Sequence, residues 1–209
     1  MRRAGVTPYV MVSDVDEAAV LVAAQGAYGS LGPDEMPLVL ARAKAEAVAR
    51  VLDAASAPAD SPSDPIVLGC DSMLELDGEV HGKPVDAAEA TARWRRMSGR
   101  SGVLHTGHWV IDLREDGSAA TLGAVASTTV HFADLSEVEI EAYVATGEPL
   151  SVAGAFTTDG LGGAFVRGIE GDHHNVVGVS LPLLRTLLAD CGVAWTSLWS
   201  PPQPSHDSA

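Results

Sequence analysis

An aspartate within an apolar stretch is the first residue whose setting suggests chemistry. Asp71 lies in the run from Ile66 to Leu76, where most neighbours are apolar. An unpaired carboxylate buried in such a run loses its hydration, so it needs a cation, a metal ion or a raised pKa. Asp71 is therefore a candidate general base or metal ligand. The alternative is a carboxylate at the end of a strand that only accepts hydrogen bonds from local backbone.

The chain contains two lysines, and both have settings that suit an anionic ligand. By helical periodicity, Lys44 falls within the apolar stripe of a predicted helix, where an ammonium group needs an anion. Lys83 lies in the turn Gly82-Lys83-Pro84, which is suited to holding an ammonium over phosphates. The alternatives are a snorkelling side chain at Lys44 and a solvated turn residue at Lys83.

Acidic residues elsewhere in the chain could hold a divalent metal ion. The corner Ser13-Asp14-Val15-Asp16-Glu17 offers three carboxylates, whose oxygens suit Mg²⁺ or Mn²⁺, although their spacing is not that of a calcium loop. His173-His174 lies beside Glu170 and Asp172, but adjacent histidines in a loop usually point apart, so we assign them no role. Acids that hold a metal ion and orient a water, together with lysines that neutralise a polyphosphate, would suit one hydrolytic site.

The surrounding sequence predicts the elements that must position these residues. The spacing predicts a helix over 38–52 with Leu40, Ala41, Val48 and Val51 on its apolar side. Turn signals and apolar runs predict strands over 6–12 and 66–76, a return at 79–81, and a long hairpin over 103–114 and 119–132. Capping patterns predict helices over 86–98, 136–147 and 180–191. Strands and helices mix without strict alternation, which favours an α/β fold with a mixed, twisted sheet and flanking helices.

Length, charge and cysteine content exclude several classes of protein. The 209 residues suit one large domain or two closely packed lobes. The formal net charge of −15 would repel a phosphate backbone, so we expect no nucleic-acid partner. The two cysteines, Cys70 and Cys191, are too few for a disulfide framework, which favours the cytoplasm. No apolar run is long enough to cross a membrane, so we expect no membrane association.

The order of the motifs along the chain resembles that of a known family. The shared motifs run in one register from residue 3 to 192, and many motifs in order are far more specific than any one of them. They are Ser13-Asp14-Val15-Asp16-Glu17, Ala43-Lys44-Ala45-Glu46-Ala47, Gly69-Cys70-Asp71-Ser72, Gly82-Lys83-Pro84, Met97-Ser98-Gly99, His105-Thr106-Gly107, residues 142–149, Ala153-Gly154-Ala155-Phe156, Ile169-Glu170-Gly171 and Asn175-Val176-Val177-Gly178. The chain resembles the Maf family of nucleoside triphosphate pyrophosphatases.

The resemblance implies a fold and an activity. The fold is two-lobed mixed α/β around a cleft, related to the inosine triphosphatase group. It would cover residues 1–200 as a single domain, leaving a disordered tail over 201–209, and the family is often dimeric. The family hydrolyses a non-canonical or pyrimidine nucleoside triphosphate to the monophosphate and pyrophosphate with Mg²⁺ or Mn²⁺. By the same resemblance, Asp71 is the proton acceptor, Lys44 and Lys83 are phosphate ligands, and Glu17 is a metal-site carboxylate.

Three departures from the family pattern affect these expectations. Members usually open with a strand and an S-x-S-P-R-R phosphate loop, and Arg2-Arg3 cannot replace this loop because only Ala4 separates it from Gly5. We therefore expect either a start upstream of Met1 or a truncation that removes a sheet edge and part of the site. Asp159 stands where the family has Gln, and an anion there could add a metal ligand or repel phosphates. Ser72 replaces Thr and keeps the hydroxyl.

Two other functions remain open at this point. A chain without the phosphate loop could be a catalytically inactive, nucleotide-binding or regulatory protein, since the family has been linked with septum inhibition. It could also be a metal-dependent phosphomonoesterase, whose product would be orthophosphate rather than pyrophosphate.

Overall fold

The computed structural model describes residues 1–54 and 57–199. The predicted tail over 201–209 and the last residue of the predicted domain lie outside the described residues. Five strands form one antiparallel sheet in the order β2-β1-β3-β4-β5. Their bounds are β1 Ile66–Leu76, β2 Glu79–His81, β3 Ser101–Asp112, β4 Thr121–Phe132 and β5 Val166–Glu170.

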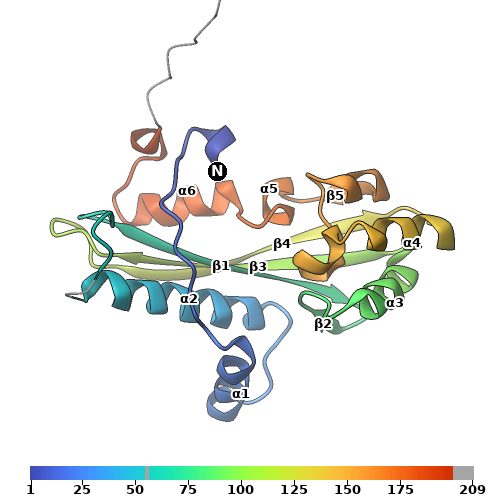
Figure 1. The fold of residues 1–209 in the computed structure, drawn as a ribbon. Helices are drawn as coiled ribbons and strands as arrows, with labels where there is room; N and C mark the ends of the chain where they lie inside the picture. Colours follow the sequence, from blue (N-terminus) through green and yellow to red (C-terminus); the bar gives the residue numbers. More distant parts are fainter. Residues whose placement is uncertain (55–56, 200–209) are drawn as a thin grey trace, which may run out of the picture.

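Helices cover both faces of the sheet (Figure 1). The helix α2, Glu35–Asp53, lies along one face, whereas α5, His173–Val176, and α6, Leu181–Asp190, lie on the other (Figure 1). The helices α3, Ala87–Met97, and α4, Glu137–Ala145, pack at the end of the sheet that carries β2, and α1, Glu17–Tyr28, contacts α2. Short 3₁₀ helices occupy Arg2–Ala4, Glu148–Ser151, Ala153–Ala155, Leu161–Phe165 and Trp195–Leu198. No helix among the described residues has the length and apolar character needed to span a membrane.

Two groups of buried side chains lie at opposite ends of β1. Leu74 and Leu76 belong to a core built around Trp94 of α3, whose Nε1 donates to the carbonyl oxygen of Ala155 at 2.8 Å. At the other end of β1, Ile66 packs against a second core made mainly by α6. The predicted α/β class with flanking helices is confirmed, and the site residues of β1 lie between the two cores.

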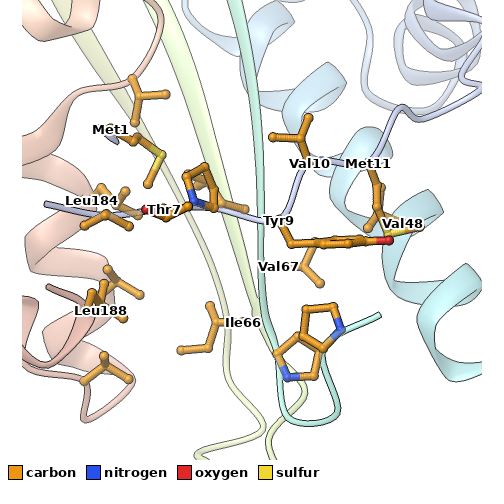
Figure 2. Close-up of a pocket in the computed structure, with 18 of the residues that line it drawn as sticks. Met1, Thr7, Tyr9, Val10, Met11, Val48, Ile66, Val67, Leu184 and Leu188 are labelled. Atoms are coloured by element: carbon orange, nitrogen blue, oxygen red, sulfur yellow. The ribbon is translucent and has the colours of Figure 1, made fainter. Parts of the chain in front are cut away.

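The outer edge of β1 has no strand partner over most of its length in the described part of the chain. The short strand β2 pairs only with residues 74–76, so residues 66–73 pair on one side alone, with β3. A pocket of about 710 Å³ lies beside this edge. Figure 2 shows that Tyr9, Val10 and Met11 line it together with side chains of β1, α2 and α6.

The structure corrects the prediction for the N-terminal residues. Residues 6–12 form no strand, because they cross the edge of β1 from the α6 side to the α2 side instead of running along it (Figure 1). Residues 17–28, which received no predicted element, form α1, whose first turn is capped by Asp16: its Oδ1 accepts from the N–H of Ala19 at 3.0 Å. Val51, predicted on the apolar side of α2, is 44% exposed, because the buried positions of that helix end at Ala45.

Candidate functional site

Two carboxylates from different elements meet at one lysine. The Nζ of Lys44, on α2, hydrogen-bonds Oδ1 of Asp71, on β1, and lies 2.7 Å from Oε1 of Glu17 at the start of α1. The side chain of Asp71 is 12% exposed and that of Lys44 is 22% exposed, whereas Glu17 is 53% exposed. The structure thus brings together three of the five residues that the sequence singled out.

Two glycines allow α2 to lie close enough to the sheet for this contact. A Cβ atom on Gly69 of β1 would lie 2.1 Å from the carbonyl oxygen of Ala41, and one on Gly107 of β3 would lie 2.4 Å from that of Pro37. Both distances are far below van der Waals contact, so only glycine fits at these positions. The close approach brings Lys44 within hydrogen-bonding distance of Asp71.

Burial and pairing act in opposite directions on the two central groups. Burial raises the pKa of Asp71 above its ordinary value, although Lys44 favours the charged form; Glu17 raises this pKa further and Lys83 lowers it. Burial opposes the charged form of Lys44 too, but hydrogen bonds to Asp71 and Glu17 outweigh it and raise the pKa of Lys44. Asp71 is therefore a carboxylate of increased basicity next to an ammonium group that is charged at neutral pH.

Lys83 lies in the turn between β2 and α3. Its side chain is exposed, the following Pro84 is buried, and the positive charge of Lys83 acts on Asp71. This position follows from the hairpin at Asp77-Gly78, because β2 returns along β1 from residue 76 to residue 74 and so carries the chain back toward Asp71. The predicted hairpin is confirmed.

Asp159 is not joined to this cluster by any contact in the described part of the chain. It is exposed and accepts a hydrogen bond from the hydroxyl of Thr157, in the loop between two 3₁₀ helices. Ser72 follows Asp71 but bonds Thr106 of β3, its Oγ lying 2.8 Å from Oγ1 of that threonine. Asp71 and Ser72 point to opposite faces of the strand, as successive residues must.

The donor chemistry around Lys44 fits a small divalent cation. Mg²⁺ and Mn²⁺ prefer carboxylate oxygens, and Glu17 and Asp71 already converge on one positive group. In the described residues, however, these two acids and Asp159 do not form a three-ligand cluster. The three-membered group that does form is Asp172, His173 and His174, whose ligand atoms lie within 4.8 Å of one another.

The two adjacent histidines do not point apart, contrary to expectation. Their ring centroids are 3.8 Å apart, because Asp172 caps the short helix α5 and its Oδ1 accepts from the backbone N–H of His174 at 3.0 Å. That local turn places both rings on one side.

Sequence reasoning missed two polar groups near the site. His105 of β3 bridges Ser127 of β4 and Glu75 of β1, its Nδ1 lying 2.8 Å from the serine and its Nε2 3.0 Å from the glutamate. Arg93 of α3 is 4% exposed and pairs with Glu89. The spacing of Glu89 and Arg93, four residues apart on a predicted helix, was the available signal for the second pair.

Comparisons with known proteins show which family the chain belongs to. The model of the family described as "Maf-like protein" matches residues 1–191, so the chain belongs to the Maf family. Three curated relatives are each named nucleoside triphosphate pyrophosphatase. The relative from Salinispora tropica is 54% identical over 206 residues, covering 99% of this chain and 84% of its own. Those from Streptomyces coelicolor and Leifsonia xyli subsp. xyli are 51% and 49% identical, each over 96% of this chain, and over 88% and 90% of their own lengths.

Proposed function

We propose that this chain is a nucleoside triphosphate pyrophosphatase, a hydrolase acting on a phosphoric anhydride. One water would be consumed at the bond between the α and β phosphates, giving the nucleoside monophosphate and pyrophosphate. The substrate class is a non-canonical or pyrimidine nucleotide. Membership of the Maf family and the names of its relatives support the pyrophosphatase activity.

The observation that carries the proposal is the meeting of Glu17, Lys44 and Asp71. Asp71 would accept a proton from the attacking water, a role that suits a buried carboxylate whose pKa is raised by burial. Lys44 and Lys83 would donate to the phosphate oxygens, where charge collects during phosphoryl transfer.

A divalent cation belongs to the same proposal. Glu17 and Asp71 would hold Mg²⁺ or Mn²⁺, and Asp159 would join them only if its loop brought the carboxylate to the cluster. A bound cation would polarise the phosphate oxygens and offset their charge. We also propose a cytoplasmic location and a homodimer; sedimentation of the purified chain measures the second.

The test is pyrophosphate release by the 209-residue chain from a panel of canonical and modified nucleoside triphosphates, with Mg²⁺ or Mn²⁺. Release that disappears in Asp71→Asn supports the proposal. Orthophosphate as the product would instead identify a phosphomonoesterase, and nucleotide binding without turnover would favour the regulatory function. If only a chain extended upstream of Met1 is active, the expected phosphate loop is required for turnover.

A further inference from the structure

The turn that carries Lys83 is attached at both ends to one ion pair of α3. Arg93 donates through Nη1 to the carbonyl oxygen of Gly82 at 2.6 Å. Glu89 accepts through Oε2 from the backbone N–H of Val85 at 2.8 Å. The two side chains also bond each other, through Nη2 of Arg93 and Oε1 of Glu89. The carbonyl oxygen of Gly82 and the N–H of Val85 flank Lys83 and Pro84. Both therefore bond to side chains that also bond to each other.

Arg93 is an unusual choice for its position on α3. It lies on the helix face that buries Ala90, Trp94 and Met97, and its side chain is 4% exposed. Burial lowers the pKa of Arg93, and Glu89 opposes this effect. Only the arginine of this pair is buried, because the side chain of Glu89 is 39% exposed. Removing a charged group from water costs free energy, so stability alone gives little reason for an arginine there.

A third element meets the turn at the same carbonyl group. The backbone N–H of Gly154, in the 3₁₀ helix Ala153–Ala155, donates to the carbonyl oxygen of Gly82 at 3.0 Å. Two donors on one acceptor fix this peptide plane relative to α3. The side chain of Lys83 itself stays exposed, close enough for its charge to act on Asp71.

We propose that Arg93 and Glu89 are positioning residues for Lys83. They hold the turn so that the lysine ammonium is placed over the substrate's phosphates before binding, which removes the cost of ordering the loop. Neither residue touches the substrate in this scheme. The inference rests on the proposed function, since it concerns how Lys83 meets a polyphosphate.

A double-mutant cycle tests the coupling. The variants are Arg93→Met, Lys83→Met and the two together, measured for kcat/KM of pyrophosphate release with Mg²⁺. Each single change should lower kcat/KM by about tenfold, the scale of one charge-assisted hydrogen bond. The double variant should lose no more than Lys83→Met alone, because Arg93 acts through Lys83. Arg93→Lys, which retains a donor for Gly82, should restore part of the loss.

Arg95→Met is the matched control on the same helix. Arg95 is exposed and pairs with Glu137 of α4, far from the turn in the hydrogen-bond network. Its loss should leave kcat/KM unchanged with or without Lys83. Where Arg93→Met does not fold, Glu89→Gln replaces it in the cycle, since the amide oxygen still accepts from Val85 while the ion pair is lost.

A second readout separates this inference from the proposed function. The Kd of inorganic pyrophosphate with Mg²⁺, measured by calorimetry across the same cycle, needs no turnover. Losses at Arg93 and Lys83 that multiply, in kcat/KM or in Kd, would overturn the positioning role. If the wild type releases no pyrophosphate but the losses in Kd at Arg93 and Lys83 still do not multiply, the proposed activity is overturned and the role of Arg93 is kept. A wild type that neither turns over nucleotide nor binds pyrophosphate would overturn both.

Discussion

Gly107 of β3 lies directly opposite Asp71 of β1 in the register of the sheet, and its missing side chain admits α2 at that point. Gly69 of β1, two residues before Asp71, also lacks a side chain where α2 approaches the sheet. The separation between helix and sheet is thus set by two glycines, and the contact between Lys44 and Asp71 depends on it.

Replacing Gly107 by alanine should therefore affect stability and activity together. The new methyl group would meet the backbone of α2, so Gly107→Ala should cost about 1–3 kcal/mol of unfolding free energy, as overpacked sites do, and lower kcat/KM. Urea unfolding and pyrophosphate release measure the two effects. Gly26→Ala is the control, because a Cβ at that helical position meets nothing within 4 Å and should be neutral or slightly stabilising. Equal changes in unfolding free energy and kcat/KM in the two variants would contradict this role of Gly107.

Replacing Asp71 by asparagine should separate turnover from folding. The amide keeps the shape of the side chain but cannot accept the proton of the water, so kcat should fall by roughly 10²–10⁴-fold, the scale of a lost general base. Lys44 retains Glu17 as its partner, so the thermal midpoint should change little. Asp190→Asn, at an exposed acid that ends α6, should leave turnover unchanged. Undiminished turnover in Asp71→Asn would remove Asp71 from the mechanism.

Removing the divalent cation should weaken binding as well as turnover. The chain carries a formal net charge of −15, which disfavours the approach of a nucleoside triphosphate. Calorimetry with a non-hydrolysable triphosphate should show a Kd at least tenfold higher in chelator than in Mg²⁺. Glu17→Gln should reduce this difference in Kd, because it removes one of the two carboxylates that would hold the cation. A Kd independent of Mg²⁺ would argue against a metal role in binding.

Asp112 should make stability depend on pH in acid. Its carboxylate is buried and accepts from Arg114 and Ser118, and these hydrogen bonds hold the pKa of Asp112 well below its usual range. A lowered pKa stabilises the fold above the unfolded value, roughly pH 4, and this contribution is lost as pH falls toward the folded value. Asp112→Asn should lower Tm at neutral pH and flatten its decline in acid. Thermal unfolding from pH 7 to 2 measures this, and a parallel decline in both proteins would refute it.

Local sequence patterns predicted most elements but not the N-terminal part of the fold. Capping residues were reliable, as at Ser136, whose capping box with Glu139 is present in the structure. Residues 6–12 have the composition of a strand, yet a strand also needs a neighbouring edge that runs alongside it, and no local pattern supplies that information. The first turn of α1 depends on Asp16, a cap read only as part of an acidic corner.

The candidate site likewise has some features that the sequence predicted and others that it did not. Lys44 and Asp71 could be predicted because a charge in an apolar pattern requires a partner, and the structure pairs them. The part played by Gly107 could not, because it depends on how closely two elements approach across 70 residues of sequence separation from Pro37. The contacts of Arg93 likewise follow from tertiary packing, which places a helix beside a turn.

The open edge of β1 bears on how the chain behaves at high concentration. A strand edge without a neighbouring strand is a template to which another polypeptide can add, and apolar walls lie beside residues 66–73 of β1, which pair with β3 alone. In the described part of the chain, residues 6–12 cross this edge and cover only part of it (Figure 1). Repulsion between strongly acidic copies opposes such association, and added salt screens that repulsion. Colloidal stability of this protein should therefore decline with ionic strength while its folded core is unaffected.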